Sequence, residues 1–98
     1  MFACRVSMHL KPNCTDEFIQ KLEQVVVPIL EKQKGYQDQV TFLAEDGTEA
    51  FGITLWDKAE SAKAYSLGTH RTVTKILSRV VEGTPRVETY EISHAYAN

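Results

Sequence analysis

The chain has 98 residues, of which 43% are hydrophobic and 24% charged, and its formal net charge at pH 7 is −2. This length and composition are typical of one globular domain, so we expect a single domain over residues 1–98. A net charge near zero, with basic residues scattered among acidic ones, gives no electrostatic reason to expect nucleic acid or an anionic membrane as a partner.

The first residues and the cysteines indicate the cellular context. Residues 1–6 do not combine a basic segment with an apolar run, and no apolar stretch is long enough to span a bilayer. Cys4 and Cys14 form neither a CxxC motif nor a metal-binding spacing. We therefore expect a cytoplasmic protein without a metal or other cofactor. Its cysteines are expected to be reduced, with Cys4 in the core and Cys14 at a helix start.

Residues 2–10 alternate in hydrophobicity and predict a strand whose apolar face carries every second residue from Phe2 to Leu10. Pro12 ends this strand. Apolar residues at spacings of three and four then predict a helix to about Lys34, closed by Gly35. Pro28 is expected to kink this helix near residues 24–27 and not to end it, because the apolar stripe continues beyond it.

Two further strands are predicted over residues 36–44 and 49–56, joined by a turn at Asp46-Gly47. A second helical region follows, beginning with Asp57 and Glu60 as a capping box, breaking at Gly68-Thr69 and resuming after His70. We expect it to run to Gly83, with a last strand over residues 86–94. His94 is expected to be exposed.

This order of elements, β-α-β-β-α-β, predicts an α+β, ferredoxin-like domain: a four-stranded antiparallel sheet with helices on one face. We expect the apolar sides of the first and third strands to meet the helices. The other face would then carry Arg5, Ser7, His9, Gly52, Thr54 and Trp56. Such a mixed face predicts a twofold, sheet-to-sheet homodimer, the alternative being a monomer with a polar outer face.

The stretch Trp56-Asp57-Lys58-Ala59-Glu60-Ser61-Ala62 is followed by Tyr65 and His70, nine and fourteen residues after the tryptophan. This pattern resembles the dimeric α+β barrel superfamily and, more narrowly, the antibiotic biosynthesis monooxygenase (ABM) domain. The resemblance covers essentially the whole chain and implies a homodimer with a pocket between sheet and helices in each subunit. Some members oxidise aromatic polyketides or quinols without metal or flavin. Others degrade haem, act as isomerases or decarboxylases, or have no known activity.

The haem-degrading branch needs an axial histidine nineteen residues after the tryptophan, where this chain has Lys75. It also needs an asparagine in the first strand, where Val6 or Ser7 stands. A protonated lysine is a poor haem ligand, so haem cleavage is not expected.

Two residues are catalytic candidates. A neutral His70 could accept a proton from a phenol or quinol, although it could equally cap a helix or lie at the surface. Tyr65 could hydrogen-bond a substrate carbonyl or pack with its hydroxyl at the rim. Candidates for substrate binding are Trp56, Met8 and Phe42, with simple packing as the alternative for Trp56. Arg5 and His9 could bind an anion or form a cross-dimer salt bridge with Glu49 or Glu88.

Two functions remain open at this point. One is a homodimeric ABM-like domain that binds a small aromatic molecule and oxygenates quinol- or anthrone-like substrates without a cofactor. The other is a non-enzymatic dimeric binding or stress-response domain whose interior is filled by Met8, Phe42, Leu55 and Leu77. An enzyme should instead bring polar groups together on an apolar cavity.

Overall fold

The computed structural model describes residues 1–93, and its elements follow the predicted order. They are β1 (Phe2–Leu10), α1 (Thr15–Lys21), the π-helix η1 (Leu22–Val26), α2 (Val27–Glu31), β2 (Tyr36–Leu43), β3 (Glu49–Trp56), α3 (Ala59–Leu67), α4 (His70–Leu77) and β4 (Val81–Glu91).

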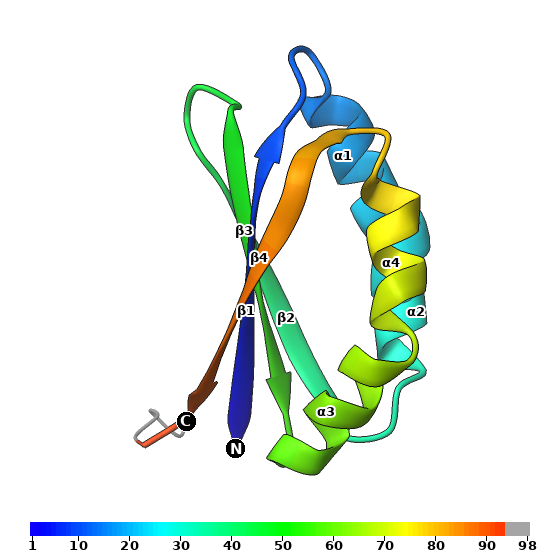
Figure 1. Ribbon diagram of the computed structural model, residues 1–98, viewed down its shortest axis with the longest axis vertical. Helices are drawn as coiled ribbons and strands as arrows, with labels where there is room; N and C mark the ends of the chain where they lie inside the picture. The colour runs from blue at the N-terminus through cyan, green and yellow to red at the C-terminus, as the bar shows by residue number, and fades with distance from the viewer. Residues whose placement is uncertain (94–98) are drawn as a thin grey trace.

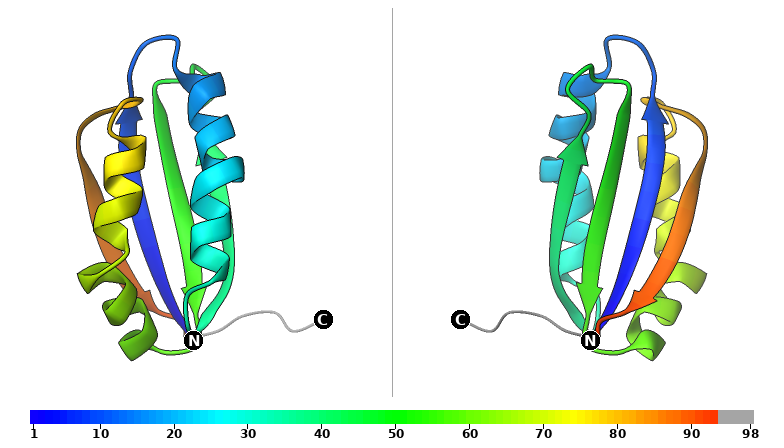
Figure 2. Two further views of the ribbon diagram at one scale, coloured as in Figure 1. Left: turned by 90° about the vertical axis from the view of Figure 1, so that its right-hand side faces the viewer. Right: turned by 90° about the vertical axis from the view of Figure 1, so that its left-hand side faces the viewer.

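The four strands form one antiparallel sheet in the order β2-β3-β1-β4. All helices lie on one side of this sheet, and the opposite side is uncovered (Figures 1 and 2). The ferredoxin-like α+β architecture expected from the sequence is therefore confirmed.

The first helical region continues through Pro28 by changing its hydrogen-bond pattern. Proline has no N–H to donate and its ring crowds the preceding turn, so an ordinary α-helix is strained there. The chain instead forms the π turn η1, in which the amide of Val27 donates to the carbonyl of Leu22. This π segment, Leu22–Val26, overlaps residues 24–27, where the kink was predicted. The helix ends at Glu31, however, and not near Lys34; Gly35, with φ of 84°, lies in the turn before β2.

The second helical region breaks at Gly68-Thr69 as predicted, but the expected capping box is wrong. The residue before α3 is Lys58, and it makes no side-chain cap hydrogen bond. The carboxylate of Asp57 instead accepts a hydrogen bond from the hydroxyl of Ser61, which lowers the pKa of Asp57.

The prediction that α4 runs to Gly83 is also wrong. The helix ends at Leu77, and β4 begins at Val81, where the strand pairs with Leu10 of β1. Gly83 adopts a φ of 72° within a register shift of this strand. Pro85 is tolerated because β4 is an edge strand, so one side of its backbone needs no partner.

The strand β3 faces the opposite way from our expectation. Its register on β1 pairs Thr54 with Cys4 and Gly52 with Val6, which places these β3 residues on the helix side. Alternation then turns Phe51, Ile53 and Leu55 to the uncovered side. The physical reason is the indole of Trp56, which is 0% exposed and donates its Nε1–H to Thr54 Oγ1 at 2.9 Å.

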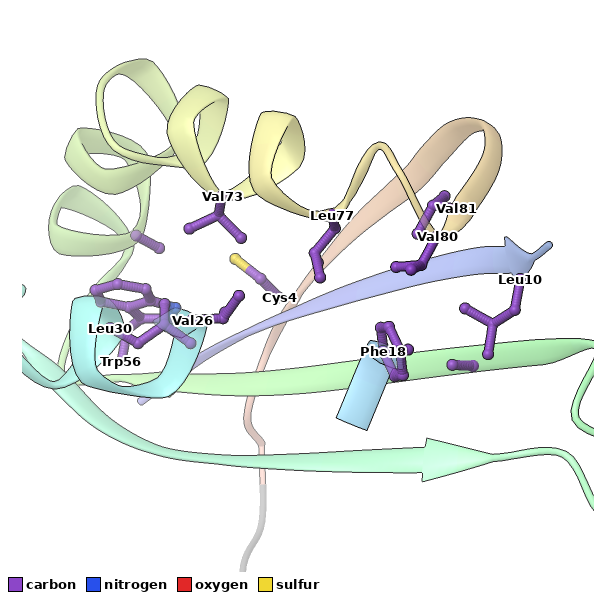
Figure 3. Close-up of a cluster of buried hydrophobic side chains, with 12 residues drawn as sticks. Cys4, Leu10, Phe18, Val26, Leu30, Trp56, Val73, Leu77, Val80 and Val81 are labelled. Carbon is purple, nitrogen blue, oxygen red and sulfur yellow. The ribbon is translucent and has the colours of Figure 1, made fainter. Parts of the chain in front are cut away.

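The core lies between the sheet and the helices (Figure 3). Its largest fully buried side chains are Trp56, Phe18 and Val80. Cys4 is buried and Cys14 precedes α1, and both are free thiols, in the positions predicted for them.

Candidate ligand-binding cavity

A cavity of about 110 Å³ lies between the sheet and the helices and is partly open to solvent. Its walls come from every strand and from both helical regions, and most of the lining surface is apolar. The floor includes the backbone of Gly52. The lining side chains include Cys4, Val6, Met8, Phe18, Leu22, Val26, Leu30, Gln39, Thr41, Thr54, Tyr65, Ser66, His70, Val73, Thr74, Leu77 and Ser78.

One wall is a row of four apolar residues from the first helical region, spaced four apart: Phe18, Leu22, Val26 and Leu30. In a regular α-helix, residues four apart are rotated by roughly 40° from one another, so such a row would wind away from the sheet. The π turn η1 holds more residues per turn and reduces this rotation. All four side chains can therefore face one cavity.

The floor of the cavity carries polar side chains from the edge strand β2 and its neighbour β3. Thr41 and Gln39 lie on β2, and the Thr41 hydroxyl donates to Gln39 Oε1 at 2.9 Å. Thr54 lies on the neighbouring strand β3, opposite Gln39 in the register. Gly52 sits beside them, paired with Thr41, and contributes no side chain.

His70 is the first residue of α4, and its imidazole forms part of the opposite wall. Its Nε2 lies 3.4 Å from the hydroxyl oxygen of Thr74, one turn further along the helix. Burial lowers the pKa of His70 below 6.5, because the charged form loses solvation there. The imidazole is therefore neutral at pH 7 and can accept a proton.

Tyr65 lies beside this imidazole, with ring centroids 5.6 Å apart in an edge-to-face arrangement. Its other neighbour is Trp56, at a centroid distance of 5.2 Å, and Trp56 contacts Tyr36 at 5.9 Å. Burial raises the pKa of Tyr65 to about 12, with a smaller contribution from Cys4. The phenol therefore keeps its proton at neutral pH and can act as a hydrogen-bond donor.

The structure brings together three of the five residues chosen from the sequence: His70, Tyr65 and Met8 all line the cavity. Trp56 does not line it and instead supports the ring of Tyr65 from the core. The placement of Phe42 was wrong. This residue is 45% exposed on the uncovered side of the sheet, stacked on Phe51 with centroids 4.6 Å apart.

Sequence reasoning missed the polar floor and Thr74. The polar residues at alternate positions of the second strand, Gln39 and Thr41, were the available signal. That signal was hidden because we expected the apolar side of the third strand, and Phe42 of the second, to face the interior. The spacing of four between His70 and Thr74 was a second signal, since such residues are neighbours on a helix.

The uncovered side of the sheet, called the outer face below, is more apolar than expected. It carries six large apolar side chains: Val40, Phe42, Phe51, Ile53, Leu55 and Tyr90. Arg5 is there too, with its guanidinium carbon 4.3 Å from the centroid of the Phe51 ring.

Two pairs of oppositely charged side chains on the outer face lie close together within the chain. His9 Nδ1 lies 3.3 Å from Glu49 Oε1 on the adjacent strand, so the predicted His9 pairing exists inside one subunit. Arg86 lies 3.5 Å from Glu88. Arg5 and His9 thus lie on the opposite side of the sheet from the cavity. His94 lies outside the described residues.

Comparison with solved structures identifies the fold. No protein-family model matches the sequence, and no curated protein does. A candidate antibiotic biosynthesis monooxygenase from Bordetella bronchiseptica superposes with a TM-score of 0.80 at 10% identity, covering 95% of this chain and 97% of that one. The chain has the fold of the antibiotic biosynthesis monooxygenase domains.

Two further solved structures with a similar fold are those of oxygenases. SnoaB, a cofactor-independent oxygenase from Streptomyces nogalater, gives a TM-score of 0.78 at 10% identity, over 99% of this chain and 97% of that chain. The monooxygenase from the gene ActVA-Orf6 of Streptomyces coelicolor, solved in complex with nanaomycin D, gives a TM-score of 0.72 at 13% identity. This superposition covers 99% of the present chain and 91% of that one. Similarity at these identities concerns the ABM fold itself.

Within residues 1–93, no helix combines the length and the apolar character needed to cross a membrane. The same residues contain no group of three or more histidine, cysteine or carboxylate side chains arranged to hold a metal ion.

Proposed function

We propose that this ABM-like chain is a cofactor-free monooxygenase that binds a small aromatic, quinol- or anthrone-like molecule in the cavity. The observation that carries the proposal is a pair of adjacent groups in a mostly apolar cavity: a neutral His70 and a protonated Tyr65. A base and a hydrogen-bond donor with altered pKa values in one cavity are typical of a catalytic site.

The chemistry needs only dioxygen as co-reactant. His70 removes a proton from the substrate, and the resulting anion gives one electron to dioxygen. The substrate radical and superoxide then join through a new C–O bond as a peroxide, which recovers the proton from His70. Loss of a second substrate hydrogen as a proton breaks the O–O bond and releases water. One oxygen atom is thus retained on the oxidised carbon as a carbonyl, and the other leaves as water.

Tyr65 has a supporting role in this scheme. Its hydroxyl donates a hydrogen bond to the substrate oxygen on which negative charge accumulates, and such a donor stabilises the anion best where water is excluded. The contact with fully buried Trp56 fixes the ring that carries this hydroxyl. The names of the structurally similar proteins, a cofactor-independent oxygenase and a monooxygenase with a bound ligand, support this reading.

We further propose that the outer face pairs with a second copy of the chain. Three of its six apolar side chains, Val40, Phe42 and Tyr90, are 45–50% exposed, and contiguous exposed apolar surface often marks an interaction site. Among the described residues, the buried Nε of Arg5 has no hydrogen-bond partner, and an oxygen of a second subunit would satisfy it. A cytoplasmic location fits the two free thiols.

The test of catalysis is oxygen consumption with a panel of hydroquinones and anthrones, followed by identification of the oxygenated product. We expect wild-type protein to exceed the spontaneous rate and the His70→Ala variant to fall to it. The matched control is His9→Ala, which removes an exposed histidine on the other side of the sheet. Equal rates for wild type and His70→Ala would rule out this mechanism, and ligand binding without oxygen consumption would leave a non-enzymatic binding domain.

A further inference from the structure

The cavity is small for a site of this kind. An apolar cavity of about 150 Å³ holds one benzene ring, whereas pockets for drug-sized ligands measure roughly 300–1,000 Å³. The present cavity measures about 110 Å³ and is partly open to solvent. The enclosed volume is therefore at most that of one aromatic ring, whose substituents would reach toward the open side, and it is too small for three fused rings.

Large buried side chains limit the cavity along the strands. Trp56, 0% exposed, and Leu30 fill the core at one end, and Phe18, 1% exposed, fills it toward Leu10 at the other (Figure 3). Close-packed interiors do not yield easily to extra volume. A longer ligand therefore cannot gain room by extending parallel to β1 and β3.

Gly52 lies in the floor of the cavity, in the middle of β3, and nothing in the backbone requires a glycine there. The glycines with positive φ are Gly35, Gly47 and Gly83. A Cβ added at Gly52 would lie 3.6 Å from Thr41 Oγ1 and 3.9 Å from the carbonyl oxygen of Val40, which are ordinary contacts. Glycine inside a strand is less stable than alanine and often marks a close approach of a ligand. The absence of a side chain at Gly52 therefore leaves space in the cavity and is not needed for the backbone conformation.

The polar groups around Gly52 suit a ring with oxygen substituents on two edges. On the floor, Gln39 accepts the Thr41 hydroxyl through Oε1, which leaves its amide NH₂ to donate to a ligand oxygen. On the opposite wall, His70 can accept a proton from a ligand hydroxyl. A hydroquinone placed over Gly52 presents one oxygen to each wall.

We infer that Gly52 is the residue that determines ligand size, and that the substrate is a single-ring hydroquinone and not an anthrone. The inference rests on the proposed function. With dioxygen, a hydroquinone gains one oxygen atom at a ring carbon and leaves as a hydroxyquinone. The second oxygen leaves as water with two substrate hydrogens, so atoms and electrons balance without another reductant.

The test measures binding, separately from turnover, by titration calorimetry with 4-methoxyphenol, 6-methoxy-2-naphthol and anthrone as one-, two- and three-ring probes. We expect wild-type protein to bind the one-ring probe at least tenfold more tightly than anthrone. The Gly52→Ala variant should bind the one-ring probe several-fold more weakly, and Gly52→Val at least tenfold more weakly. The control Ile53→Val, on the same strand but on the outer face, should bind as wild type.

Melting temperatures of the same proteins report on folding. The Gly52→Ala variant fits the strand without strain. Its binding of the one-ring probe therefore tests the role of Gly52 even if the Gly52→Val variant unfolds. Anthrone binding as tight as that of the one-ring probe, unchanged binding by the Gly52 variants, or no binding of any probe would overturn the inference. Size-selective binding that depends on Gly52, but without oxygen consumption, would support the inference and refute the proposed catalysis.

Discussion

The proposed dimer can be tested at Phe42, which is 45% exposed at the outer face. Burying a whole phenylalanine side chain stabilises by about 1.5–3 kcal/mol, so covering the exposed part contributes about 0.7–1.4 kcal/mol in each subunit. A twofold interface contains this residue twice. The Phe42→Ala change should therefore weaken dimerisation by about 1.4–2.7 kcal/mol, or roughly ten- to hundredfold in Kd.

The assay is sedimentation velocity over a dilution series from high to low micromolar concentration. The control is Leu67→Ala, which removes an 80% exposed leucine from α3, on the helix side of the sheet. Phe42 also stacks on Phe51, so chemical unfolding must show that the Phe42→Ala variant is folded at the concentrations used. A wild-type protein that sediments as one subunit throughout, or equal weakening by Leu67→Ala, would contradict the proposal.

Three further predictions concern the core and the cavity. Trp56→Ala should destabilise the fold by about 3–5 kcal/mol in urea unfolding, because it empties a fully buried site and leaves Thr54 without its indole partner. Burial lowers the folded-state pKa of His70, so the unfolded state binds more protons between that value and 6.5. Stability should thus fall as the pH decreases below about 6.5. The His70→Gln variant should lose less stability than wild type between pH 7.5 and 5.5, and an equal loss would contradict this reasoning. Tyr65→Phe should leave probe binding within several-fold but slow oxygen consumption by about tenfold or more, and an unchanged turnover rate would remove the donor role.

The sequence alone was sufficient where the information is local. The alternation over residues 2–10 predicted which side of β1 is buried, because successive side chains of a strand point to opposite faces. Pro28 and the continuing apolar stripe predicted a distorted but unbroken helix. Gly68-Thr69 predicted the break between α3 and α4. The pattern at Trp56, Tyr65 and His70 located the two polar residues that meet in the cavity.

Only the tertiary structure decided which side of β2 and β3 faces the helices. One side of β3 carries Phe51, Ile53 and Leu55, and the other carries Trp56. In contrast to β1, the alternation of this strand therefore does not state which of its sides is buried. The choice depends on the register with β1, which buries Trp56 and brings Thr54, Gly52 and Thr41 to the cavity floor. Likewise, Val81 joins β4 because Leu10 is available to pair with it. Such pairings are made between segments that are distant in the chain, so local periodicity does not contain them. Local periodicity specified the strands and helices. Packing between these elements determined which side of each strand is buried, and with it the cavity and the outer face.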